Sequence, residues 1–526
     1  MIDPITLQVM IGALRAACEE MGATLIRSAY SANIKERHDC STALFDASGE
    51  LVMQAEHIPV HLGSMPDAVA AVLDEEHEPE VEWILNDPYR GGTHLPDITL
   101  VSPVFVAGEL FGFAASRAHH ADVGGPTPGS MPAFSRRLDE EGVVIPPTRL
   151  PPVRSQKSPV SGEKCERTGG GVAGDAGALE ELVAAMRNPR QRLADLRAQQ
   201  SANRVGRLRL AELAARHGVE GLREGMAEIL AYAERRTRAA LAALPDGTYT
   251  AEDVLEDDSP DGEERDVVLR VTATIDGETL RLDFEGTDPQ VEGNLNCPLS
   301  VTRSAAFFAV RVLTDPDAPP CAGAHRPIEV TAPRGCLLDA APPAAVVAGN
   351  VETSSRVADL VIAALAGARP VPAQGQGTMN NLTLAGEDFT YYETLGGGQG
   401  ACPDADGPSA VHVAMSNTLN TPVEALETEF PLRVRTLAIR RGSGGEGAHR
   451  GGDGLVRELE ALAPMRFTLL TERRRRAPRG RDGGAAGTPG QNLRDGRHLP
   501  SKSEGDLAPG NRLRIETPGG GGLGSP

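Results

Sequence analysis

The stretch NDPYRGGTHLPDITLVSPVFVAGELFGFAASRAHHADVGG, residues 86–125, contains two apolar runs on either side of a short turn. The runs cover residues 98–106 and 110–116, and the turn between them is Ala107-Gly108-Glu109. Apolar runs joined by a few residues that include glycine are typical of a β-hairpin. We therefore expect two antiparallel strands here, with polar residues gathered at the open end of the hairpin.

The register of this hairpin would bring metal-binding side chains together. If Val106 pairs with Leu110, counting back along both strands places Asp97 opposite His119. Residues paired across antiparallel strands have Cβ atoms about 4.5–5.5 Å apart. His94 precedes Asp97 in a bend that contains glycines and a proline, so two imidazoles and a carboxylate converge. Those ligand types suit a catalytic metal site that keeps one coordination position open.

The residues next to these candidates suggest supporting roles. Adjacent strand residues point to opposite faces, so at most one of His119 and His120 should be a metal ligand. We predict Asp97, His120 and Asp122 as catalytic residues, with His120 and Asp122 placed to orient a ligand imidazole. The alternative interpretation is a chance HxxD spacing beside a solvated strand end.

A second hairpin is expected upstream, with strands over residues 40–45 and 51–55. The same counting places Asp39 near His57, at the open end of that hairpin, with a shift of one residue if a glycine bulge intervenes. Asp39 then becomes a candidate fourth ligand contributed by a separate hairpin. The alternative is an ordinary aspartate at a strand edge.

The composition excludes several classes of protein. The chain has 526 residues, of which 40% are hydrophobic and only 3% aromatic, so a large aliphatic core is expected. A formal net charge of −21 argues against nucleic-acid binding, which needs a basic surface. The seven cysteines show no CxxC motif, which fits reduced thiols in the cytoplasm. Neither a secretory leader nor a membrane-spanning run is expected.

The pattern of helices, strands and turns indicates an α+β fold with several domains, hairpin-rich mixed sheets and a central helical segment. The predicted parts are an N-terminal α+β metal-site domain (1–150), a loop or linker (151–177), a helical segment (178–244), a β-rich domain (245–345) and a C-terminal α+β part with glycine-rich loops (346–526). We expect the arginine run at residues 473–476 to be a solvated strand end.

Familiar nucleotide-binding and nucleophile motifs do not support a function here. GxGxxG occurs at residues 169–174 and 442–447, but neither copy lies between an expected strand and an immediately following helix. The sequence holds no Gly-Lys pair for a phosphate-binding loop and no GxSxG nucleophile turn.

Nine segments spread along the chain resemble the hydantoinase B/oxoprolinase family. They are NIKERHDCSTALFD (33–46), HIPVHLGSM (57–65), NDPYRGGTHLPD (86–97), HHADVGG (119–125), GNVETSSRVAD (349–359), YYETLGGGQGA (391–401), MSNTLNTPVEALE (415–427), LPSKS (499–503) and ETPGGGG (516–522). The family includes B subunits of ATP-dependent hydantoinases, the matching part of 5-oxoprolinase and the catalytic subunits of acetone-type carboxylases.

The resemblance implies a metal site made by Asp39, His94, Asp97 and His119, holding a divalent ion such as Zn, Mn, Fe or Co. It also implies a hydantoinase A-type partner that binds ATP and Mg and phosphorylates the carbonyl oxygen of a small cyclic amide substrate. Water on the metal of the B-type chain would then attack the activated carbon and open a hydantoin or 5-oxoproline ring. The alternatives are a subunit of an acetone-type carboxylase and a non-catalytic partner that only stabilises its A-type partner.

Overall fold

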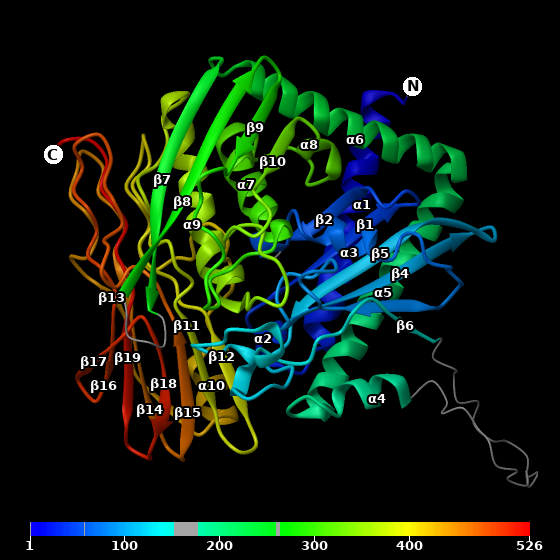
Figure 1. The fold of residues 1–526 in the computed structure, drawn as a ribbon. Coiled ribbons are helices and arrows are strands. Elements are labelled where there is room, and N and C mark those ends of the chain that lie inside the picture. The colour runs from blue at the N-terminus through cyan, green and yellow to red at the C-terminus, as the bar shows by residue number, and fades with distance from the viewer. Residues whose placement is uncertain (1, 57, 152–176, 259–263) are drawn as a thin grey trace, which may run out of the picture.

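The computed structural model describes residues 2–56, 58–151, 177–258 and 264–526. Within them, helices alternate with four β-sheets whose strands are mostly antiparallel, so the predicted α+β class with hairpin-rich mixed sheets is confirmed. Figure 1 shows the N-terminal sheet and its helices on one side of the molecule and the C-terminal strands on the other. No helix among the described residues is long and apolar enough to cross a membrane.

The N-terminal sheet contains both predicted hairpins. Its strand order is β2-β1-β5-β4-β3-β6. The strands are β1 (Cys40–Asp46), β2 (Leu51–Glu56), β3 (Glu82–Leu85), β4 (Asp97–Val106), β5 (Glu109–His119) and β6 (Thr148–Leu150). Helix α3 (Met65–Ala70) packs on one face around Trp83 and Phe113.

The other face of this sheet is covered by long helices. They are α1 (Pro4–Ser28), α5 (Pro189–His217) and α6 (Val219–Ala242), with the short helices α2 (Ala32–Lys35) and α4 (Gly177–Val183) beside them. Asp3 caps α1 by accepting backbone hydrogen bonds from Ile5 and Thr6, each 3.0 Å long. One hydrophobic cluster joins α1, α5 and α6 to the sheet, so the segment predicted as 178–244 shares its core with the N-terminal part. The predicted linker 151–177 falls almost wholly outside the described residues.

The central sheet has the order β10-β9-β8-β7, and β10 joins it in parallel. Its strands are β7 (Gly247–Asp258), β8 (Glu264–Asp276), β9 (Thr279–Asp283) and β10 (Ile328–Thr331), accompanied by helices α7 (Leu299–Thr314), α8 (Ala322–His325) and α9 (Ser354–Ala364). The hydrophobic cluster beneath this sheet extends from Ile58 to Leu470. Residue 345 was the predicted boundary between the β-rich domain and the C-terminal part. The hydrophobic core is continuous across it, so this division into domains remains a prediction.

Two sheets make up the C-terminal part, in the orders β12-β11-β15-β18 and β13-β14-β19-β16-β17. The elements are β11 (Asn381–Ala385), β12 (Thr390–Glu393), α10 (Val423–Glu429), β13 (Leu432–Arg440), β14 (Gly454–Ala461), β15 (Met465–Leu470), β16 (Gln491–Arg494), β17 (Arg497–Leu499), β18 (Lys502–Leu507) and β19 (Arg512–Glu516). Glycine-rich loops pack backbone to backbone between them. A Cβ atom on Gly398 would lie 2.0 Å from the carbonyl oxygen of Gly452, so only glycine fits there.

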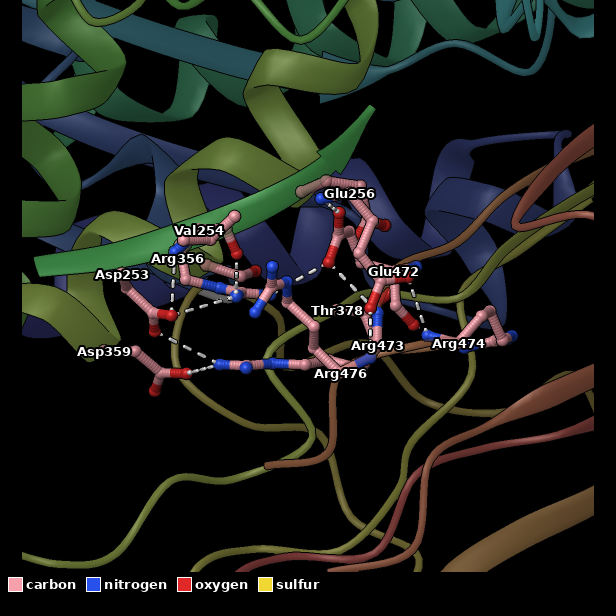
Figure 2. A network of polar contacts seen from close by, with 12 residues as sticks. Asp253, Val254, Glu256, Arg356, Asp359, Thr378, Glu472, Arg473, Arg474 and Arg476 are labelled. Atoms are coloured by element: carbon pink, nitrogen blue, oxygen red, sulfur yellow. Dashed lines mark hydrogen bonds and ion pairs between the residues drawn. The ribbon is translucent and has the colours of Figure 1, made fainter. Parts of the chain in front are cut away.

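A buried ionic network ties the central sheet to the C-terminal sheets (Figure 2). The Arg473 guanidinium lies 3.4 Å from Asp253 of β7 and 3.4 Å from Asp359 of α9. Arg356 of α9 lies 3.0 Å from Glu472. The prediction that residues 473–476 form a solvated strand end is wrong for Arg473, which is 1% exposed. Carboxylates distant in sequence pair with it, and no local pattern reveals them.

Candidate metal centre

The β4–β5 hairpin has the predicted register where the candidate ligands lie. Asp97 is paired with His119, as counting from the turn predicted. The prediction is wrong at the turn itself, because Val106 pairs with Glu109 rather than with Leu110. A bulge between Val104 and Phe105 shifts the register and restores the expected pairing farther along.

The bend before Asp97 brings His94 to the same place. Gly91 has φ +97°, a conformation that a residue with a side chain rarely adopts. A Cβ on Gly92 would lie 2.4 Å from the carbonyl oxygen of Asn86, so the chain can turn tightly only with glycine here. Asn86 fixes the bend, because its side-chain amide donates a 2.8 Å hydrogen bond to the carbonyl oxygen of Leu95.

Three side chains form a compact, buried cluster of metal-binding atoms. His94 Nε2 and His119 Nδ1 each lie 3.2 Å from Asp97 Oδ1, and one ligand atom from each residue lies within 4.8 Å of the others. His94 Nδ1 and His119 Nε2 are buried without a hydrogen-bond partner, whereas His94 Nε2 faces the Asp97 carboxylate. Burial lowers the pKa of His119 even though Asp97 raises it, which favours the neutral imidazole that a metal ligand requires. The cluster therefore fits a divalent transition metal.

Asp39 reaches the same cavity from the second hairpin. It is 3% exposed, its carbonyl oxygen accepts a 3.1 Å hydrogen bond from the backbone of His119, and it lines the cavity with the three clustered residues. The compact cluster itself comprises His94, Asp97 and His119, so Asp39 is a neighbouring candidate ligand. A bulge between Leu44 and Phe45 shifts the β1–β2 register. His57, which counting placed near Asp39, lies outside the described residues.

Two residues that sequence analysis missed hold the other oxygen of Asp97. Thr93 Oγ1 donates a 2.7 Å hydrogen bond to Asp97 Oδ2, and His61 Nε2 lies 3.4 Å from the same oxygen. His61 Nδ1 is in turn 3.0 Å from Ser41 Oγ. Burial raises the pKa of Asp97, but the neighbouring histidines lower this pKa by more. The net result is a pKa well below the usual value of an aspartate. The signal for His61 was its place in the segment HIPVHLGSM, residues 57–65.

The C-terminal part of the chain closes the other side of this cavity. The ring of Tyr392 stacks on His119, with the ring centroids 4.6 Å apart and the planes inclined by 15°. Arg37 donates a 2.7 Å hydrogen bond to the carbonyl oxygen of Tyr392 and so joins the two parts. Asn350, Val351, Met379 and Thr394 complete this side of the wall. The cavity measures about 10 Å³, which is room for about one water molecule.

His120 and Asp122 lie outside the cavity. His120 Nε2 is 2.9 Å from the side-chain oxygen of Gln199 on α5, and burial together with the charge of Arg192 lowers its pKa to about 4. Asp122 accepts backbone hydrogen bonds from Gly124 (2.8 Å) and Gly129 (2.6 Å). Both residues thus have partners that fix local structure. We expected them to orient a ligand imidazole, but the structure does not bring either of them to the three clustered ligands.

The fold and the site define an α+β protein with a buried histidine–carboxylate cluster at the open end of a β-hairpin. The profile of the hydantoinase B/oxoprolinase family matches residues 3–526. The chain belongs to this family, and the resemblance inferred from the nine segments is confirmed.

Among proteins in the family, 5-oxoprolinase 1 of Arabidopsis thaliana is 38% identical over 99% of this chain, which spans 42% of that protein. A Pseudomonas protein named as the B-type subunit of a putative D-/L-hydantoinase is 32% identical, and the match covers 100% of this chain and 90% of that protein. The chain thus spans about two-fifths of the 5-oxoprolinase relative but most of the hydantoinase relative.

Two solved structures share the fold. The ATP-dependent caprolactamase from Pseudomonas jessenii has a TM-score of 0.89 at 28% identity, and the match covers 100% of this chain and 92% of that one. A nucleotide-free acetone carboxylase chain has a TM-score of 0.85 at 18% identity, covering 99% of this chain and 76% of that one. At that identity, the second likeness shows the fold alone.

Proposed function

We propose that this chain is the B-type catalytic subunit of an ATP-dependent cyclic amidohydrolase, which opens a hydantoin or 5-oxoproline ring. The observation that carries the proposal is the buried cluster of His94, Asp97 and His119, whose unpartnered imidazole nitrogens suit a metal. The family includes proteins named 5-oxoprolinase and hydantoinase, and the caprolactamase shares the fold over the whole chain. All three names denote enzymes of cyclic amides.

His94, Asp97 and His119, together with Asp39, would hold a divalent ion such as Zn, Mn, Fe or Co. Such an ion supplies Lewis-acid chemistry, which lowers the pKa of water and polarises a carbonyl group. Thr93 and His61 orient Asp97 through its Oδ2 atom, and Tyr392 fixes the plane of the His119 ring. The walls of this cavity come from both parts of the chain and leave room for about one water molecule.

The proposal assigns ATP, with its Mg, to a hydantoinase A-type partner. A lactam carbonyl is a poor electrophile, and phosphorylation of its oxygen makes the carbon far more reactive. The partner would carry out that step, and this chain would deliver water to the activated carbon. Two facts support the division: the chain has no phosphate-binding loop motif, and its hydantoinase relative of similar length is named as a subunit.

The two alternatives predict different activities. An acetone-type carboxylase subunit would join a ketone to activated bicarbonate, but the likeness to acetone carboxylase supports only the fold. A non-catalytic partner would not need the complete set of buried ligand residues that this chain retains.

The test combines this chain with its A-type partner and follows ADP and product with hydantoin, 5-oxoproline, caprolactam, or acetone with bicarbonate. We expect ATP-dependent ring opening of at least one cyclic amide and no carboxylation of acetone. Carboxylation without any ring opening would replace the proposal by the first alternative, and no product with any substrate would support the second.

A further inference from the structure

Asn350 is a buried amide beside the candidate metal ligands that the proposed chemistry does not use. It lies in η4 (Gly349–Thr353), a π-helical turn that leads directly into α9. Such wide turns displace side chains from regular helical positions and are frequent at functional sites. Gly349 lets the turn pack closely, because a Cβ there would lie 1.8 Å from the carbonyl oxygen of Asn296. The turn therefore holds Asn350 firmly against the cavity.

The side-chain oxygen of Asn350 lacks a hydrogen-bond partner. The residue is 3% exposed and lines the cavity, yet its Oδ1 atom is buried and receives no hydrogen bond. Buried side-chain oxygens are normally satisfied by a donor, because burying one without a partner is unfavourable. An exception within a candidate active site indicates a donor that arrives with the ligand.

The other polar groups of the same wall already have partners. The Tyr392 hydroxyl donates a 2.8 Å hydrogen bond to Asn381, and Thr394 Oγ1 accepts a 2.6 Å bond from Arg37. Val351 and Met379 are apolar. Among the described residues of this wall, Asn350 is thus the group left to contact a polar part of a substrate.

We infer that Asn350 Oδ1 accepts a hydrogen bond from the ring N–H of the substrate and so selects cyclic amides that carry an N–H group. This inference rests on the proposed ring-opening function and narrows its substrate class. A ketone such as acetone has no N–H to donate and would leave this oxygen unsatisfied. A ring exceeds the volume of the present cavity, so its binding requires the two walls to separate.

The test compares two probes that differ only at the ring nitrogen, caprolactam and N-methylcaprolactam. The metal-loaded chain is combined with its A-type partner, and each probe's inhibition constant is measured against the ring that the complex opens fastest. The wild type should bind caprolactam about ten- to a hundredfold more tightly than the N-methyl compound. In Asn350→Leu this preference should fall to about twofold or less.

A matched variant separates recognition from packing. Met379→Leu alters another residue of the same wall without changing a polar group, so the preference for the N–H probe should persist. Metal content and thermal unfolding of Asn350→Leu show whether it folds, and Asn350→Ala provides a smaller replacement if it does not. If the partner subunit is what rejects the N-methyl probe, the preference for caprolactam would be the same in the wild type and in the variants.

The outcomes distinguish the two levels of the argument. An unchanged preference in Asn350→Leu and Asn350→Ala, with ring opening intact in the wild type, overturns the role of Asn350 alone. Failure of the wild-type complex to open any ring overturns the proposed function, and this inference with it.

Discussion

At the scale of single residues, Asp97 shows how the chain fixes a candidate ligand from both sides. Its Oδ1 atom faces the imidazoles of His94 and His119, while its Oδ2 atom is held by Thr93 and His61. A carboxylate held in this way loses little rotational freedom when it binds a metal. Partners of this kind orient ligands and tune their affinity for the ion.

We predict that His94→Ala removes most of the metal, because it deletes one of the three clustered ligands. Thr93→Val should weaken metal affinity about tenfold to a hundredfold, since Asp97 then loses its shortest hydrogen bond. Elemental analysis of purified protein tests the first variant, and competition with a chelator tests the second.

The matched control for His94→Ala is His498→Ala, which alters an exposed histidine on β17. It should retain the metal content of the wild type. Equal metal content in His94→Ala and His498→Ala would show that the ion binds elsewhere.

At the scale of elements, the turn that leads into α9 carries a buried acid. Glu352 is 1% exposed, and its Oε1 atom accepts a 2.9 Å hydrogen bond from the side chain of Asn381. Burial raises the pKa of Glu352 to about 8, and the nearby charge of Glu472 also raises it. The folded protein therefore keeps this carboxyl protonated at neutral pH.

This acid makes stability depend on pH in a definite direction. The unfolded chain ionises Glu352 above its ordinary pKa of 4.5, whereas the folded chain retains the proton up to about pH 8. Its contribution to stability is present in full below pH 4.5 and is lost as the pH rises to about 8. In the wild type, Glu352 should lower the unfolding free energy by up to about 1.4 kcal/mol for each pH unit between about pH 5 and 8. Glu352→Gln should lack this part of the decline.

Urea denaturation of wild type and Glu352→Gln at several pH values measures this difference. The exposed residue Glu424 on α10 provides the control, and Glu424→Gln should follow the wild-type curve. Parallel curves for wild type and Glu352→Gln would mean that Glu352 is already ionised in the folded protein.

The junction between β7 and the loop after β15 depends on Asp253. This carboxylate is 3% exposed and lies 3.4 Å from Arg473 and 3.5 Å from Arg356 (Figure 2). Asp253→Asn removes the negative charge and leaves two buried guanidinium groups incompletely paired. We expect a loss of about 3–5 kcal/mol in unfolding free energy.

Chemical denaturation tests this prediction against Asp506→Asn, whose side chain is 88% exposed and should have almost no effect. A loss below about 1 kcal/mol in Asp253→Asn would show that Asp359 and Glu472 suffice to neutralise the junction.

At the scale of the whole molecule, the site joins segments that lie hundreds of residues apart. The pairing of Asp97 with His119 was predictable, because hairpin register follows from counting along adjacent strands. The bulge in β4 that restores this pairing was not predictable, since many types of residue tolerate a bulge. The positions of Tyr392 and Asn350 depend on how the C-terminal part packs against the hairpin. Sequence periodicity contains no such information, and only family resemblance pointed to those segments.

The burial of Arg473 and the position of His120 illustrate the same limit. The sequence around Arg473 is strongly basic, and its acidic partners come from β7 and α9. Strand alternation correctly separated His119 from His120, but it could not show that His120 meets Gln199 of α5. Local rules therefore predict elements and faces, whereas partners across the core require the assembled fold.

The proposed division of labour between this chain and an A-type partner gives the last prediction. If the A-type partner makes the activated substrate and this chain supplies water, Asp97→Ala should separate the two half-reactions, because it removes a clustered ligand. ATP cleavage by the partner should continue while ring opening falls at least about a thousandfold, which corresponds to about 4 kcal/mol of lost transition-state stabilisation.

The measurement is the ratio of ADP to opened product in the reconstituted complex, with Asp506→Ala as the exposed control. The ratio should rise steeply in Asp97→Ala alone. A ratio equal to that of the wild type, with near-normal turnover, would mean that Asp97 only supports the fold and that water is activated at another site.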